Sequence, residues 1–135
     1  MTQPHESLNA TFSRFIQAVC EVDCNVLREV ATQDVSIDVP GASFVDITES
    51  TEGSEALCKW AETVRGECGR MSFSFHRYFE NGCELMASGR IQIERLPRLF
   101  DSPCAFHVRV EAGRIAAFQL LLDTYALQKF RGEFD

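Results

Sequence analysis

The segment GRIAAFQLLLD, residues 113–123, is an apolar run that begins at a glycine and ends at an aspartate. Its length and composition predict a long strand. A second alternating run, residues 105–111, is separated from it by only Ala112 and the first glycine, so we expect the two to pair as a hairpin. Asp123 then precedes a helical pattern at residues 124–130, for which it is a suitable N-cap. The remainder of the chain is expected to wrap around this hairpin.

Helical periodicity dominates the N-terminal part of the chain. Residues 1–6 are expected to form a flexible N-terminus. From Ser7, apolar residues recur at helical spacing and predict a helix that ends near residues 21–22; they are Leu8, Phe12, Phe15, Ile16, Val19 and Cys20. Asp23 is a suitable N-cap for a second, short helix.

A short strand and a third helix are expected next. Residues 35–39 alternate and stop at Pro40-Gly41, which predicts a strand with Val35, Ile37 and Val39 facing inward and Ser36 and Asp38 facing the other way. Residues 41–52 resemble a polar loop. The third helix should begin at Gly53 or Ser54 and end at Gly66 or Gly69, with an apolar face of Leu57, Trp60, Ala61 and Val64.

The C-terminal half is predicted to be β-structure. Residues 71–80 and 83–95 alternate, and Asn81-Gly82 between them is a strong signal for a type I′ hairpin turn. Gly89 is expected to mark a bend or a bulge. Arg77 falls on the phenylalanine face of its strand, which predicts either a bulge or a side chain that reaches the mouth of the fold. Residues 96–103 are expected to form an apolar-tipped loop.

Helices followed by long antiparallel strands indicate an α+β fold. We expect a cone-shaped, curved, mostly antiparallel sheet wrapped around about three N-terminal helices, an α+β barrel. Residues 7–135 should form this single domain. The interior of such a cone is the natural site for a ligand.

Composition excludes several classes of function. The net charge of −7 argues against a nucleic-acid or anionic-membrane partner. The chain has neither an apolar run long enough to span a membrane nor a visible secretory signal, so we predict a cytoplasmic protein. The six cysteines are scattered without a C-x-x-C pair and are therefore expected to be reduced core residues. We expect no metal site and no cofactor.

Several short segments together resemble the nuclear-transport-factor-2-like superfamily, and within it the SnoaL-like polyketide cyclases and ketosteroid isomerases. The resemblance covers nearly the whole chain. It is carried by Arg14-Phe15-Ile16, Asp34 to Pro40, Gly53-x-x-x-Leu57-x-x-Trp60, Asn81-Gly82-Cys83, Val108-Arg109-Val110, Gly113-Arg114-Ile115 and Leu122-Asp123-Thr124. The resemblance implies a cone-shaped α+β barrel, commonly a homodimer packed through the outer face of the sheet.

The resemblance also locates the family's proton-handling positions. The helix-1 tyrosine of the ketosteroid isomerases falls on Phe15, the base on Val39 and the second acid on Phe106. The acid that the SnoaL-like cyclases and limonene-epoxide-hydrolase group place in the last strand falls on Leu120. None of these four positions carries a side chain that could donate to an oxyanion or accept a proton. We therefore predict no steroid-isomerase activity by that mechanism. We predict instead an apolar pocket that binds a small apolar molecule, lined by Phe15, Val19, Val39, Trp60, Phe106, Val108, Phe118, Leu120 and Leu122.

The catalytic residues of any enzyme of this type stay unassigned. One alternative is a SnoaL-like isomerase, cyclase or hydrolase that uses relocated polar groups: Asp38, Asp123, His76 and Arg77. Three of them have a simpler explanation, because Asp123 is a suitable helix cap and alternation places Asp38 and His76 on outer positions. Arg77, if it reaches the mouth of the fold, could orient an anionic ligand. His107 and Arg109 are expected on the outer face, with Arg109 in a salt bridge. A third hypothesis is a structural dimerisation domain with a filled interior.

Overall fold

The computed structural model describes residues 4–41 and 50–132, with side chains for residues 8–41 and 53–132. Within these ranges the chain forms four helices and six strands. In chain order they are α1 (Pro4–Glu21), α2 (Cys24–Val30), β1 (Ala31–Asp38), β2 (Ser50–Glu52), α3 (Ser54–Glu67), β3 (Arg70–Asn81), β4 (Glu84–Arg95), β5 (Arg98–Glu111), β6 (Arg114–Leu122) and α4 (Thr124–Gly132). Most of the predicted loop 41–52 lies outside the described residues.

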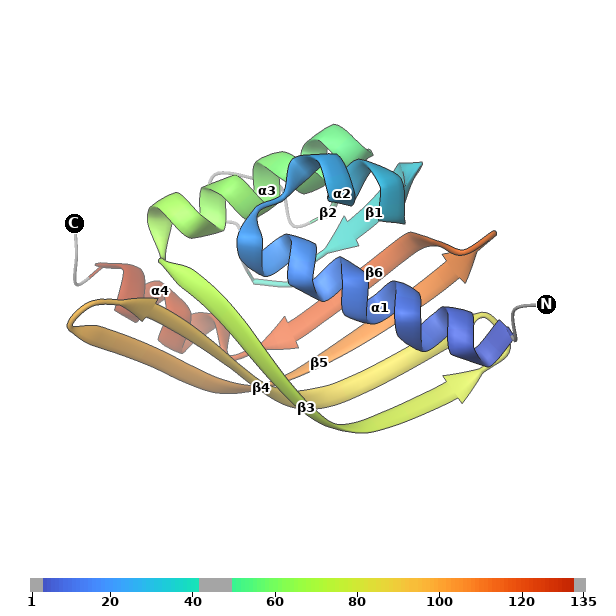
Figure 1. The fold of residues 1–135 in the computed structure, drawn as a ribbon. Helices are drawn as coiled ribbons and strands as arrows, with labels where there is room; N and C mark the ends of the chain where they lie inside the picture. The colour runs from blue at the N-terminus through green and yellow to red at the C-terminus, as the bar shows by residue number, and fades with distance from the viewer. Residues whose placement is uncertain (1–3, 42–49, 133–135) are drawn as a thin grey trace.

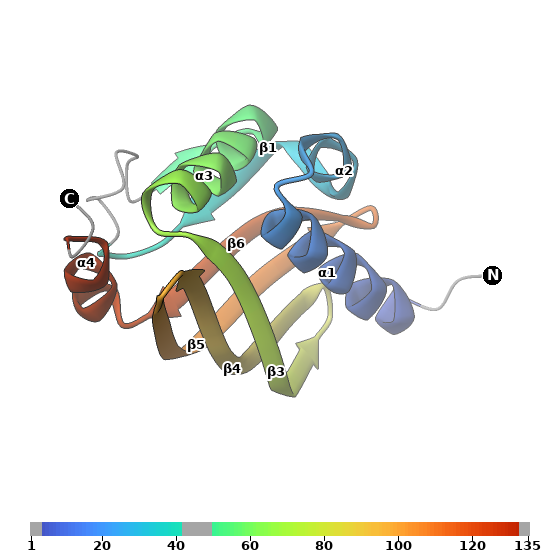
Figure 2. The same cartoon turned by 60° about the vertical axis from the view of Figure 1, so that its left-hand side comes forward.

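The strands form one curved sheet in the order β2-β1-β6-β5-β4-β3. Only β1 and β6 pair in parallel; every other neighbouring pair is antiparallel. The concave face of the sheet holds α1, α2 and α3, and α4 lies at the end of the sheet near the β4–β5 turn (Figures 1 and 2). This arrangement confirms the predicted α+β cone. We call the convex face, opposite the helices, the outer face.

The long strands bend because of a bulge in β3. The pairing of β3 with β4 shifts register between Phe75 and Arg77, opposite Gly89. A Cβ atom on Gly89 would lie 1.9 Å from the backbone oxygen of Ser74, so only glycine fits this close approach. The bulge alternative for Arg77 is therefore correct, and Gly89 marks it.

The β5–β6 hairpin forms as predicted. Its two turn residues, Ala112 and Gly113, have φ of 52° and 76°. The β3–β4 turn differs by one residue from the prediction, because Asn81 pairs with Glu84 and leaves Gly82 and Cys83 as the turn residues. Of these two, Gly82 has the positive φ, 65°.

Three boundaries differ from the sequence-based expectation, and one short strand was not expected. α1 begins at Pro4 rather than Ser7, since the fixed φ of proline suits the first turn of a helix. β1 starts at Ala31, and the short strand β2 pairs with it. Residues 98–103, predicted as part of a loop, are the first half of β5, where their backbone pairs with β4. The other helix ends agree within about two residues.

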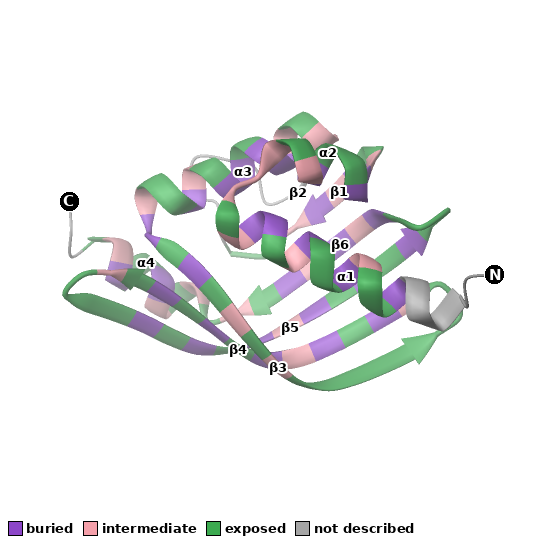
Figure 3. Ribbon diagram, viewed as in Figure 1, coloured by how far each residue is buried: buried purple, intermediate pink, exposed green. Residues whose placement is uncertain are grey.

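Burial follows the alternation of the strands and one stripe of each helix (Figure 3). The side chains of α1 and α3 that face the sheet join those on its concave face in one apolar core. Within the described residues, no helix is long and apolar enough to cross a membrane.

Candidate functional site

The nine predicted pocket residues all face the interior of the cone. Eight of them are buried and Leu122 is half-buried. They come from α1 (Phe15 and Val19), the residue that follows β1 (Val39), α3 (Trp60), β5 (Phe106 and Val108) and β6 (Phe118, Leu120 and Leu122). The four positions where the resemblance expects a proton-handling side chain therefore lie inside the cone and are apolar: Phe15, Val39, Phe106 and Leu120.

Aromatic rings fill the centre of the cone. The Phe15 ring lies 5.2 Å from that of Phe118 and 6.3 Å from that of Phe106, measured between ring centroids. Trp60 packs edge-on against Phe118 at 5.6 Å. Ring pairs at such distances are in direct contact, so this part of the interior is occupied by the protein's own side chains.

An apolar void remains at the end of the cone next to α4. Its volume is about 20 Å³. We call it the apolar end cavity; it is lined by Val39, Trp60, Val64, Met71, Ile91, Ile93, Leu120, Leu122 and Leu127. Four of these were predicted as pocket residues. Val64 was predicted to lie on the apolar face of its helix but not in the pocket. The other four lining residues, Met71, Ile91, Ile93 and Leu127, were not predicted as pocket residues.

The polar residues considered for catalysis do not meet in the interior. The Asp123 carboxylate accepts a hydrogen bond from the Ala126 backbone N–H at 2.9 Å, as expected for an N-cap of α4. Its own backbone N–H donates to the Ser102 hydroxyl at 3.1 Å. His76 and Arg77 are both exposed at the bulge of β3. These positions provide no acid–base pair facing the apolar end cavity.

Asp38 instead joins a polar groove on the outer face. The Gln119 side-chain amide donates to the Asp38 carboxylate at 2.8 Å, and His107 pairs with Glu84 at 2.6 Å. Arg109 forms the predicted salt bridge, with Glu111. The groove has a volume of about 290 Å³, and its polar lining consists of Ser36, Asp38, Glu84, His107, Arg109 and Gln119. Each of these charged groups thus already has a hydrogen-bond or ion-pair partner, either inside the groove or beside it.

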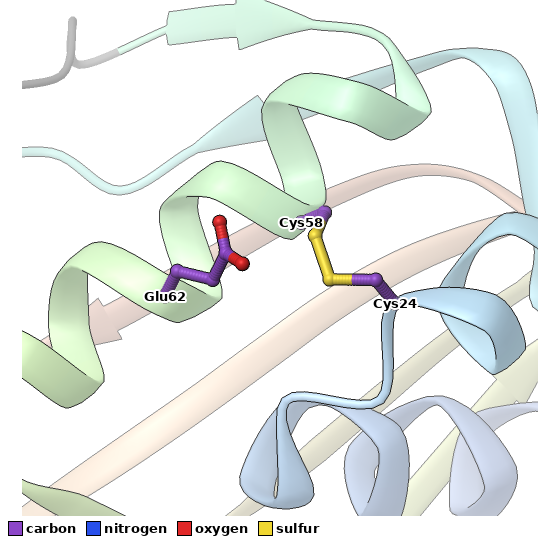
Figure 4. A group of neighbouring side chains, drawn as sticks. All are labelled: Cys24, Cys58 and Glu62. Atoms are coloured by element: carbon purple, nitrogen blue, oxygen red, sulfur yellow. A yellow bond between two sulfur atoms is a disulfide. The ribbon is translucent and has the colours of Figure 1, made fainter.

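The cysteines do not behave as predicted. Cys24 and Cys58, which are 34 residues apart, form a disulfide that joins α2 to α3, so the expectation of six reduced thiols is wrong (Figure 4). The spacing rule failed because the two residues come together only through packing of the helices. Burial raises the pKa of the remaining Cys20, Cys68 and Cys104 thiols to about 11, which makes them poor nucleophiles near neutral pH.

One group of side chains within the described residues has the donor set of a metal site. It consists of the two disulfide cysteines and Glu62, which lies one turn further along α3 (Figure 4). It is separate from the interior of the cone.

Comparison with known families and structures agrees with the architecture. The profile of the SnoaL-like domain matches residues 12–118. No curated protein sequence matches. An NTF2-like protein of unknown function from Burkholderia pseudomallei superposes with a TM-score of 0.81 at 17% identity, covering 92% of this chain and 96% of the other.

Two other solved structures have similar folds. An LEH-like epoxide hydrolase from M. tuberculosis superposes with a TM-score of 0.75 at 15% identity over 95% of this chain and 91% of its own. TerC, co-crystallised with polyporic acid, superposes with a TM-score of 0.82 at 13% identity over 93% and 98%. At these identities the likeness establishes the fold alone.

Proposed function

Because this chain belongs to the SnoaL-like family, we propose that it binds a small apolar molecule at the α4 end of the cone, without the acid and base groups of the family's enzymes. The observation that carries the proposal is the lining of the apolar end cavity, in which every residue is apolar. Val39 and Leu120, two positions where the resemblance expects an acid, are part of that lining. An apolar cavity of this kind stays dry and favours an apolar occupant.

The cavity must widen to take a ligand. Its volume of about 20 Å³ is far below the roughly 300 Å³ of a typical small-molecule site. We assign the widening to α4, because this helix has only nine residues and contributes Leu127 to the cavity wall. The packing of Phe130 on Phe100 and the salt bridge between Arg131 and Glu67 hold its far end. A small outward displacement of α4 would join the cavity to solvent.

A structural relative is consistent with this proposal. TerC, which has the same fold, was crystallised with polyporic acid, so the fold can accommodate an organic molecule. We carry over only that possibility, not the identity of the ligand.

The proposal can be tested with neighbouring leucines of opposite orientation. Naphthalene serves as a neutral apolar probe, and its binding to the full chain is measured by ligand-detected NMR and by the fluorescence of Trp60. Leu122→Ser places a hydroxyl in the cavity wall and should weaken binding about 5- to 30-fold, from the loss of roughly 1–2 kcal/mol of apolar contact. Leu121→Ser is the matched control, because Leu121 is 47% exposed and does not line the cavity. Equal effects of the two substitutions, or no binding by the unaltered chain, would contradict the proposal.

The alternative of an enzyme with relocated groups has less support. Asp38 bonds to Gln119 on the outer face and Asp123 caps α4, so neither carboxylate is available inside the cone. We expect no double-bond shift in a model enone above the rate in buffer. Turnover that depended on Asp38 or Asp123 would favour the enzyme instead.

We also propose that the chain forms a homodimer through the outer face. This face presents four exposed apolar side chains among paired charges, namely Phe79, Met86, Leu99 and Leu121. Leu121→Asp should shift the mass measured by light scattering from dimer to monomer. Leu96→Asp, at the exposed β4–β5 turn, should leave it unchanged. We also propose a cytoplasmic location. In the cytoplasm the Cys24–Cys58 pair would encounter reductants.

A further inference from the structure

A cluster on the helical side of the fold carries chemistry of its own. Cys24 opens α2, Cys58 lies in α3, and Glu62 follows four residues later on the same face of α3. The Cα atoms of the two cysteines are 5.4 Å apart. The two Sγ atoms and a Glu62 carboxylate oxygen all lie within 4.8 Å of one another (Figure 4). Two packed helices therefore hold three potential donor atoms around one point.

These three donor atoms are of the types that a thiophilic divalent cation binds. Zinc binds thiolate sulfur at about 2.3 Å and carboxylate oxygen at about 2.0–2.2 Å, in a tetrahedron whose ligand atoms are about 3.5–3.8 Å apart. In the reduced chain, rotation of the cysteine side chains would be needed to separate the sulfurs to this distance, and the Glu62 oxygen already lies within 4.8 Å of both. Glu62 is exposed, so solvent has access to a fourth coordination position.

The charges around the cluster leave the Glu62 carboxylate available. Arg28 interacts electrostatically with Glu62, but its guanidinium makes its shortest hydrogen bond to Glu55, at 2.7 Å. Among the described residues, Glu62 takes part in no ion pair, so binding a cation would break none. Cys58 is buried and Cys24 half-buried, which shields the sulfur side of the site from solvent.

We propose that Cys24, Cys58 and Glu62 form a redox-gated site for one divalent cation of the Zn²⁺ class. The cation binds the two thiolates and the carboxylate after the thiols lose their protons. The disulfide excludes it, because its sulfurs carry no negative charge and are weak ligands, whereas the metal needs thiolates. This site was not expected from the sequence, and it does not depend on the apolar ligand proposed above.

The metal-bound state is converted to the disulfide by a two-electron oxidation, for which hydrogen peroxide is the class of oxidant that we specify; a small-molecule dithiol returns the disulfide to two thiols by exchange and is itself oxidised to a disulfide. The two thiolates give up two electrons, the S–S bond forms and the O–O bond of the peroxide breaks. Two protons from solvent complete two molecules of water, and the cation is released. The disulfide and the bound cation each link α2 to α3, so the two helices are cross-linked in either redox state. Bound metal then indicates that the two cysteines are reduced.

The test uses the full chain with Cys83→Ser, which removes the exposed free thiol. The protein is reduced, freed of reductant without air and titrated with Co²⁺, whose visible absorption reports tetrahedral sulfur coordination. We expect one Co²⁺ per chain, displaced by Zn²⁺, none in the oxidised protein, and release of one cation per chain on addition of hydrogen peroxide. The absence of stoichiometric binding by the reduced protein, or equal binding by both forms, would overturn the proposal.

Two exposed acids provide a matched comparison. Glu62→Gln should weaken Co²⁺ affinity by at least ~10-fold, the effect typical of disturbing a metal site. Glu29→Gln removes the same charge from the neighbouring helix α2 and should leave the affinity unchanged. Cys24→Ser should abolish the sulfur-to-cobalt absorption. Equal affinities of the two glutamine variants would show that Glu62 is not a ligand and would refute the three-donor site.

Discussion

Reduction of the Cys24–Cys58 disulfide should lower the free energy of unfolding substantially. The cross-link spans a sequence separation of 34 residues, a segment that contains α2, β1, β2 and the first residues of α3. In the chain-entropy description, removing a cross-link that closes a loop of this length lowers the free energy of unfolding by about 4 kcal/mol at 25 °C, because the reduced unfolded chain regains conformational freedom. With a urea dependence of roughly 2 kcal/mol per molar, the midpoint of unfolding should fall by about 2 M.

Trp60 makes the measurement direct, since it is the only tryptophan and is 2% exposed in the folded chain. Urea titrations followed by its fluorescence are run on the oxidised and reduced protein with a metal chelator in both buffers. The chelator keeps the reduced cysteines free of metal, so that the two titrations differ only in the cross-link.

Two controls decide the outcome. Cys24→Ser should unfold like the reduced protein and should not respond to reductant, whereas Cys83→Ser should behave like the unaltered chain. A thiol assay in denaturant should find four reactive cysteines before reduction and six after it. Coincident unfolding curves for the oxidised and reduced protein, or six thiols before reduction, would refute the reasoning.

Three other perturbations test the fold and its thiols. Gly89→Ala should lower the free energy of unfolding in urea by about 2–4 kcal/mol, because the new Cβ would meet the Ser74 backbone oxygen at 1.9 Å. Gly66→Ala, with open space around it, should raise that free energy by roughly 0.5–1 kcal/mol. Equal effects of the two substitutions would contradict the bulge. Asp123→Ala should remove the cap of α4 and cost about 1 kcal/mol, and Asp123→Asn should restore most of it; no loss would mean that the cap is not used. At pH 8, iodoacetamide should label exposed Cys83 before the other free thiols, as located by peptide mass analysis, because burial raises the pKa of Cys20, Cys68 and Cys104 to about 11. Since these folded-state pKa values exceed the ordinary thiol pKa of 9.0, the stability that the three thiols contribute should be complete below pH 9 and be lost as the pH rises toward 11. Stability that increased over this range would contradict the assignment.

Local patterns determined most of the elements of this protein. The helical spacing of α1, the caps at Asp23 and Asp123 and the short turn between β5 and β6 each involve residues close together in the sequence. Strand alternation also identified which side chains face the interior, because neighbouring residues of a strand point to opposite faces. The inward position of Val39 could therefore be predicted from alternation, and that of Phe15 from the helical spacing of α1, before any fold was known.

Tertiary packing decided what local patterns cannot encode. The parallel pairing of β1 with β6 and the disulfide between Cys24 and Cys58 join residues far apart in the chain. The size of the end cavity depends on how the Trp60 ring and α4 pack together, and a list of apolar residues does not contain that volume. Glu62 became a candidate ligand only when α2 and α3 came into contact. Sequence fixes which side chains are available at each turn or pleat, whereas distances between separate elements follow from the packing of the whole chain.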